Sequence, residues 1–131
     1  MTSRTSALAA LLIAPFLVSQ ASAQAVRLIG DYRDWSAYSA SEGAGALCFA
    51  LSKPTQVTPT PDGFTEAFLY LTNRPAEGIR NEFNLVAGFN FAADQPATAS
   101  VGGQSFELFT ESDAAWLLDP ALNDSLAGAM R

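Results

Sequence analysis

The chain lacks histidine altogether, and its only cysteine is Cys48. Histidine is the side chain that most often acts as a general base near neutral pH, and it is the commonest metal ligand. Nucleophile pairs of the Ser-His and Cys-His types are excluded for the same reason. A phosphate-binding loop is also missing, because Gly43 and Gly45 are followed by no third glycine, lysine or helix start. We therefore expect no catalytic residue, no metal site and no cofactor.

Basic residues are scarce. The chain has 7 Lys and Arg against 13 Asp and Glu, which gives a formal net charge of −6. No stretch gathers Lys or Arg, so the protein would repel a phosphate backbone rather than hold it. Nucleic acid is therefore not an expected partner, and the even spread of acidic residues indicates solubility rather than a binding tail.

The long apolar run is confined to the N-terminus. Arg4 supplies a positive start, residues 7–18 are almost unbroken apolar, and Ala21-Ser22-Ala23 has the small-x-small pattern of a signal peptidase site. The run is about a dozen residues long, too short for the ~20 that a membrane-spanning helix needs. We expect residues 1–23 to be a cleaved signal peptide. Residues 24–131 should then form one soluble exported domain without an integral membrane span.

Cys48 lies within an apolar run, from Ala46 to Leu51. An exported protein meets an oxidising compartment, in which cysteines are normally paired. A lone cysteine is therefore either a buried thiol that packs as a small hydrophobe or half of a disulfide whose partner is missing. A reactive thiol needs a nearby cation, and the sequence neighbours of Cys48 are apolar.

Short segments rich in aromatic and β-branched residues alternate with turn residues, a pattern typical of an all-β domain. From Asn81 to Phe89, apolar residues recur at every second position, which predicts a strand with one packed face and one wet face. Residues 46–52 are almost continuously apolar and predict a strand buried on both faces. Gly102-Gly103 predicts a tight hairpin. The other expected strands are 35–38, 67–72, 98–101, 104–109 and 114–118, with an exposed loop over 55–63.

The last segment changes its period. Asp119 is a suitable N-cap, and Pro120 fits the first helical position. Apolar residues then recur at a spacing of four, at Leu122, Leu126 and Met130. The expected fold is therefore all-β, an Ig-like β-sandwich of antiparallel strands that ends in a short C-terminal helix.

Aromatic residues are the largest apolar side chains of these segments. Burying one such ring contributes about 1.5–3 kcal/mol before the entropy of ordering the chain is subtracted. The rings are sufficient for one two-layer core, and the alternative is an aromatic face that binds a ligand. They are Trp35, Phe49, Phe68, Tyr70, Phe83, Phe89, Phe106, Phe109 and Trp116.

The densest polar segment runs from Asn73 to Glu82. Arg80 and Glu82 lie two residues apart, so on a strand they would project from the same face and could pair. Arg74 is held in a loop by Pro75. The segment is either a hairpin connection with an exposed ion pair, worth about 0–1 kcal/mol, or a recognition patch of Arg74, Arg80 and Glu82, because binding residues gather on loops held by strands.

The carboxylates that could serve acid-base chemistry are Glu107, Glu111 and Asp113. On one strand Glu107 and Glu111 share a face at roughly 13 Å, which is wider than the ~5–9.5 Å of a glycosidase pair. A solvated strand end is the simpler interpretation.

Several pieces of the chain, taken together, resemble the invasion-associated locus B family of exported bacterial proteins. They are Asp34 to Tyr38, Cys48 to Ser52, Thr72 to Gly88 with Arg74-Pro75 and Arg80-Asn81-Glu82, and Gly102 to Trp116. The resemblance implies a β-sandwich-like fold, export and a link with host-cell association, but no enzyme activity, ligand or catalytic residues. Family members commonly have a cysteine where this chain has Ser39, and they usually continue past Arg131 through further strands. We therefore expect residues 24–131 to lack the C-terminal strands of the domain.

These observations predict an exported, non-enzymatic protein that is periplasmic, associated with the outer membrane, or secreted. Its expected partner is an envelope or host-surface protein, bound through a strand edge or through the region from Arg74 to Glu82. A structural or stress-related periplasmic protein without a specific ligand is the second hypothesis. A hydrolase that uses carboxylates alone is the third.

Overall fold

The structure is a computed structural model that describes residues 25–43 and 45–131. The signal peptide predicted for residues 1–23 lies outside the described residues. The strands are β1 (Arg27–Tyr32), β2 (Trp35–Glu42), β3 (Gly45–Ser52), β4 (Phe68–Arg74), β5 (Ile79–Val86), β6 (Ala97–Val101), β7 (Gln104–Glu111) and β8 (Ala114–Leu117). Two 3-10 turns, η1 (Pro75–Glu77) and η2 (Pro120–Leu122), and the helix α1 (Asn123–Ala129) complete the fold.

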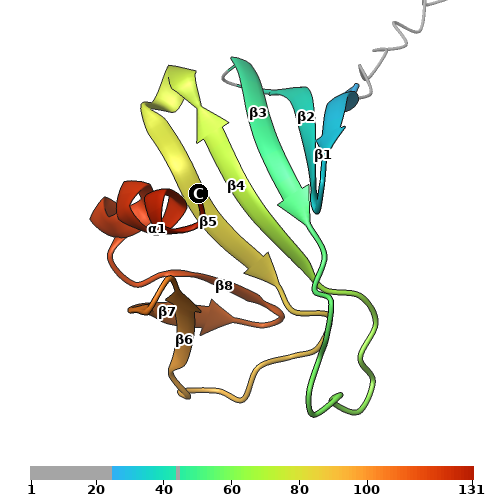
Figure 1. Ribbon diagram of the computed structural model, residues 1–131, viewed down its shortest axis with the longest axis vertical. Helices are drawn as coiled ribbons and strands as arrows, with labels where there is room; N and C mark the ends of the chain where they lie inside the picture. The colour runs from blue at the N-terminus through green and yellow to red at the C-terminus, as the bar shows by residue number, and fades with distance from the viewer. Residues whose placement is uncertain (1–24, 44) are drawn as a thin grey trace, which may run out of the picture.

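All neighbouring strands are antiparallel and belong to one 8-stranded sheet in the order β1-β2-β3-β4-β5-β8-β7-β6. Strands β1 to β5 fan out along the molecule, whereas β8, β7 and β6 turn across the end of β5 (Figure 1). The helix α1 packs beside β5 within this bend (Figure 1). The prediction of an all-β, sandwich-like antiparallel fold with a short C-terminal helix is confirmed, and its layers come from one bent sheet.

Local sequence signals explain several of these elements. Gly102 and Gly103 have φ values of 57° and 77° and form the β6–β7 turn, as predicted, because glycine tolerates positive φ. Asp119 caps the C-terminal segment, since its side chain accepts a hydrogen bond from the Ala121 backbone N–H at 3.0 Å. The predicted loop over 55–63 lies outside any strand or helix.

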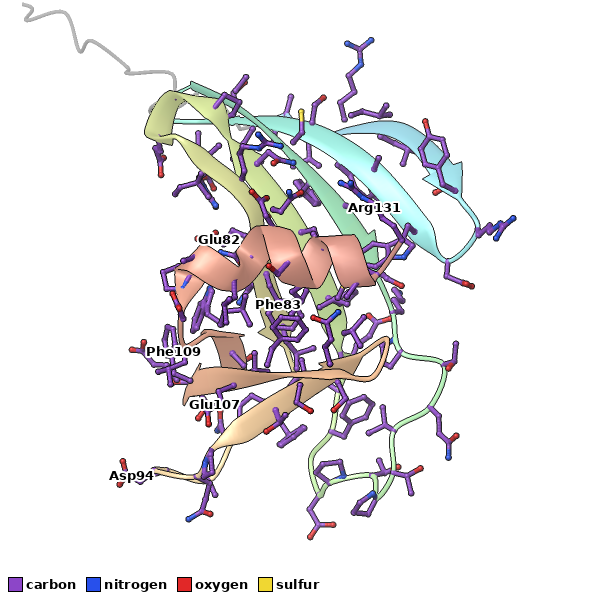
Figure 2. The ribbon with its side chains drawn as sticks, turned by 60° about the vertical axis from the view of Figure 1, so that its left-hand side comes forward. Glu82, Phe83, Asp94, Glu107, Phe109 and Arg131 are labelled. Carbon is purple, nitrogen blue, oxygen red and sulfur yellow. The ribbon has the colours of Figure 1, made fainter. Side chains whose placement is uncertain are left out.

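The core lies on the side of the sheet that faces α1, which we call the helix face. Strand alternation and register place Phe83, Ala115, Leu117 and Leu108 on this side. Leu126 of α1 closes the cluster and is fully buried, at 0% exposure. Figure 2 shows Phe83 beneath the helix. The alternation predicted from Asn81 to Phe89 is confirmed for Glu82 to Val86, with Phe83 buried and Glu82 on the opposite side, but the strand ends before Ala87 and Phe89.

The edge strand β1 was not predicted from the sequence. It pairs only with β2 among the described residues, and its register shifts between Leu28 and Gly30, which makes Ile29 an extra, bulged residue. Most of its side chains are exposed.

Within residues 25–43 and 45–131, no helix has the length and apolar character needed to cross a membrane.

Candidate functional site

The second side of the sheet, which we call the open face, carries a band of aromatic rings. Phe49, Tyr70 and Trp116 lie on this side because the register places them on the face opposite to Phe83 and Leu117. Neighbouring rings pack on one another, with centroid separations of 5.1 Å for Tyr38–Phe49, 5.9 Å for Phe49–Tyr70, 6.2 Å for Phe68–Tyr70 and 5.3 Å for Phe109–Trp116. The band thus consists of one group of rings over β2, β3 and β4 and a stacked pair on β8 and β7, with Asn84 of β5 between the two.

The expectation that the aromatic rings form the core is correct only in part. Phe83 and Phe106 are buried, at 3% and 5% exposure. Phe109 is exposed, and the other rings named from the sequence are only half-buried: Trp35, Phe49, Phe68, Tyr70, Phe89 and Trp116. Helix α1 packs on the helix face, and within the described residues no helix covers the rings of the open face.

A hollow of about 430 Å³ lies within this band, and we call it the aromatic hollow. Its apolar members include Leu47, which is buried, and the half-buried Phe49 and Tyr70. The complete lining is Val26, Ala40, Glu42, Leu47, Phe49, Tyr70, Thr72, Arg74, Glu82, Asn84, Val86 and Trp116. A mainly apolar cavity with a few converging polar groups is the usual form of a binding site.

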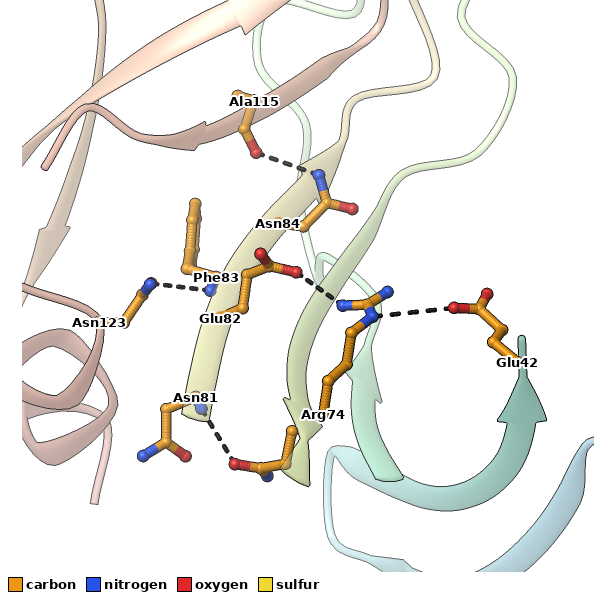
Figure 3. Close-up of polar contacts among 9 residues, drawn as sticks. Glu42, Arg74, Asn81, Glu82, Phe83, Asn84, Ala115 and Asn123 are labelled. Carbon is orange, nitrogen blue, oxygen red and sulfur yellow. Dashed lines mark hydrogen bonds and ion pairs between the residues drawn. The ribbon is translucent and has the colours of Figure 1, made fainter. Parts of the chain in front are cut away.

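Arg74 brings the polar groups of the hollow together. Its Nη1 lies 2.8 Å from Oε1 of Glu82, and its Nε lies 3.7 Å from Oε2 of Glu42 (Figure 3). The Arg74 side chain is 28% exposed, whereas those of Glu82 and Glu42 are 31% and 53% exposed. Two glutamates against one arginine leave this end of the hollow with a net charge of −1.

The structure places the three residues of the predicted recognition patch, whose role in recognition stays a prediction. Arg74 and Glu82 are joined, but the predicted pairing of Arg80 with Glu82 is wrong. The β4–β5 register shifts between Thr72 and Arg74, and Asn81 has a φ of 50°. This bulge reverses the alternation of β5, so Arg80 points away from the side that carries Glu82 and remains exposed.

Asparagine side chains fix the backbone around the hollow. Asn73 accepts a hydrogen bond from the Asn81 N–H at 3.0 Å, which holds the bulge in place. Asn84 donates to the Ala115 carbonyl at 3.3 Å, and Asn123 of α1 accepts from the Phe83 N–H at 2.9 Å (Figure 3). These bonds tie β5 to β4, β8 and α1, so the residues that line the hollow are held in fixed positions.

Tyr70 is the aromatic residue whose ionisation the hollow alters. Burial raises the pKa of its hydroxyl above the ordinary value of 10.0, because the phenolate loses hydration. The Tyr70 hydroxyl is therefore neutral at physiological pH and can both donate and accept a hydrogen bond.

The prediction of Cys48 as a buried thiol is wrong. Cys48 is free and exposed, and as the chain's only cysteine it cannot form a disulfide within the chain. Residues 46–52 were expected to be buried on both faces, but Leu47 is buried while Cys48, next to it, lies on the other side of β3 and is exposed. An unbroken apolar run does not reveal that only one side of the strand is covered at this point.

The carboxylates considered for catalysis are not brought together. Glu111 lines one hollow and Asp113 lines another, and Glu107 lines neither. Figure 2 shows Glu107 and Phe109 at the outer side of the β6–β8 part of the sheet. Among residues 25–43 and 45–131, no group of three or more His, Cys, Asp or Glu side chains is placed to hold a metal ion.

No family model, curated protein or solved structure matches the chain. The resemblance to the invasion-associated locus B family therefore stays a prediction, as do export, the domain boundary at residue 24 and the missing C-terminal strands. An aromatic face that binds a ligand was the alternative to an aromatic core, but the hollow itself was not located from the sequence. A signal for it was present, because Phe49, Tyr70 and Trp116 alternate with residues that the core requires.

Proposed function

We propose that the mature chain is an exported, non-enzymatic binding protein that holds a partner protein of the envelope or of a host surface on its open face. The observation that supports this proposal is the aromatic band. Large rings that a domain of this size would normally bury instead lie half-buried or exposed on the open face, in one group over β2, β3 and β4 and in a stacked pair on β8 and β7.

The chemistry of the band is that of a protein interface. Tyrosine, tryptophan and arginine contribute most of the binding energy in known interfaces, in well-packed pockets near the centre of the contact. Tyr70, Trp116 and Arg74 all line the aromatic hollow. Contiguous apolar surface that is rimmed by polar residues marks interaction sites on soluble proteins. Here Glu42 and Glu82 supply such polar groups.

Export is supported by the sequence pattern of residues 1–23. Mass spectrometry of the protein from fractionated cells gives the test. We expect a mature N-terminus at Gln24 in the periplasmic or outer-membrane fraction or in the medium, and an intact N-terminus at Met1 would contradict export.

Site-specific photo-crosslinking in the source cell, or on host cells, tests the binding surface. Phe49 is replaced by p-benzoylphenylalanine, and the matched control carries this residue at Asp62, which is exposed in the loop between β3 and β4. We expect a discrete light-dependent adduct from position 49 and none from position 62. Equal adducts from both positions, or none from either, would contradict the proposal, and the latter would favour a structural protein without a specific ligand.

The cross-linked partner, once identified and purified, allows a quantitative test by calorimetry. Trp116→Ala removes a ring that lines the aromatic hollow. We expect a loss of about 2 kcal/mol, or roughly 30-fold in Kd, because a central aromatic anchor is removed. Trp35→Ala is the control, since Trp35 is the other half-buried tryptophan and lies on the helix face. Equal losses from the two variants would show that the effect is one of stability rather than contact.

A further inference from the structure

A second recess lies where β5 and β8 separate. β8 pairs with β5 only over Asn84 to Val86, and at Phe83 the side chain of Asn123 takes the place of a neighbouring strand. The recess has a volume of about 370 Å³ and adjoins the aromatic hollow, with which it shares Trp116 and Glu82. We call it the acidic notch, because Glu82 and Glu111 both line it.

The notch joins two aromatic rings to these two carboxylates. Phe109 and Trp116 stack with centroids 5.3 Å apart and planes inclined by 20°. Phe109 is 43% exposed, so the stacked pair is open to solvent on one side. The faces of aromatic rings carry negative charge density and attract cations.

No Lys or Arg lines the notch among the described residues. The nearest arginine of the neighbouring hollow, Arg74, is already shared between Glu82 and Glu42. Glu82 uses only its Oε1 toward Arg74, and Glu111 has no ion pair among the residues that the structure describes. The excess negative charge of this site agrees with the net charge of −6 of the whole chain.

We propose that the acidic notch binds an arginine side chain of a basic segment of the partner protein. A guanidinium is planar, stacks on aromatic rings and donates paired hydrogen bonds to carboxylates. In the notch it would lie against Phe109 and Trp116 and donate paired hydrogen bonds to Glu111, while Glu82 adds a second negative charge to the lining of the same recess. Apolar residues of the same segment would occupy the adjoining aromatic hollow. This inference rests on the proposed function and specifies the chemistry of the partner.

The test uses two peptides with the purified mature chain. The probe is acetyl-Leu-Arg-Leu-Arg-Leu-Arg-amide, and its matched control has citrulline, which is neutral and of the same shape, in place of each arginine. We expect the arginine peptide to bind at least about tenfold more tightly by calorimetry, and its affinity to fall as salt is raised, because the carboxylates and rings act together.

Variants on one strand locate the site. Glu111→Gln should weaken the arginine peptide by about threefold to tenfold and leave the citrulline peptide unchanged, which corresponds to the loss of one partly exposed charge contact. Glu107→Gln is the control, because Glu107 lies on the same strand and the same side but outside the notch, and it should have no effect.

The outcomes separate this inference from the proposed function. Equal affinity for the two peptides, no binding of either peptide, or equal effects of Glu111→Gln and Glu107→Gln would overturn the arginine site. Cross-linking from position 49 would be unaffected by that result, so a partner that uses the aromatic hollow through uncharged residues would still satisfy the proposed function.

Discussion

Gly88 connects the end of β5 with the long loop between β3 and β4, and its replacement by alanine should be strongly destabilising. Gly88 has a φ of +76°, and a Cβ at this position would lie 2.7 Å from the Glu66 carbonyl oxygen and 3.0 Å from the Glu66 nitrogen. The Gly88 carbonyl also accepts the Thr65 N–H at 2.9 Å. The backbone atoms of Glu66 therefore leave no room for a methyl group.

The magnitude follows from two separate costs. A positive φ costs an alanine about 1–2 kcal/mol relative to glycine. Forcing a methyl group into a filled space costs about 1–3 kcal/mol more. We expect Gly88→Ala to lower the free energy of unfolding by about 2–5 kcal/mol in total, which is a large part of the stability of a small domain.

Gly63→Ala isolates the first cost. Gly63 has nearly the same φ, +73°, but a Cβ there would meet nothing within 4 Å. Both substitutions restrict the unfolded chain equally, so the difference between them measures the close approach to Glu66 alone. We expect this difference to be about 1–3 kcal/mol.

Urea unfolding of the mature chain, followed by tryptophan fluorescence, measures both variants on the same scale. A difference below about 0.5 kcal/mol between Gly88→Ala and Gly63→Ala would refute the reasoning. The loop that Gly88 holds covers an apolar cavity of about 310 Å³ between the loop and the ends of β4 and β5. An increase in the binding of an apolar fluorescent dye by Gly88→Ala would confirm that the loop has loosened.

Three further predictions concern stability. Leu126→Ala should cost about 2–5 kcal/mol in urea unfolding, because Leu126 is fully buried between α1 and the sheet; a cost below about 1 kcal/mol would mean that the helix is not part of the cooperative core. Asn123→Ala should cost about 1–2 kcal/mol and speed amide exchange at Phe83, whose N–H it leaves unpaired; unchanged exchange would contradict the role of this bond. Because the pKa of Tyr70 is raised above 10.0, its contribution to stability is complete below about pH 10 and is lost as the pH rises further. Tyr70→Phe should therefore lose less stability than the unsubstituted chain above pH 10, and equal losses from the two chains in urea unfolding over that range would contradict the reasoning.

Much of the fold could be predicted from short-range signals. The Gly102-Gly103 turn, the Asp119 cap and the alternation from Glu82 to Val86 each depend on neighbouring residues, and each was predicted correctly. β1 escaped prediction because its residues show no alternation and are exposed on both sides, so no pattern of burial marks it as a strand.

The candidate site was harder to predict because it depends on contacts that are distant in sequence. Alternation tells which residues share a side of the sheet, but not which side α1 will cover, and so Trp116 and Phe83 looked equally suited to the core. The two-residue period of a regular strand placed Arg80 on the same face as Glu82. The bulge at Asn81, which breaks this period, gives no clear signal in the sequence. Arg74 also pairs with Glu42 of β2, and this contact depends only on the order of the strands in the sheet.

The bulge at Ile29 has a consequence for solubility. The edge of the sheet carries the exposed apolar residues Val26, Leu28, Ile29 and Tyr32, which on a regular strand would invite copies of the chain to polymerise edge to edge. The extra residue reverses the side of the sheet to which the following side chains of β1 point. A regular strand from another copy that pairs in register with Leu28 would therefore be out of register when it reaches Asp31. We therefore expect a shared sheet to extend over only a few residues of β1, which would disfavour the growth of fibres from this edge.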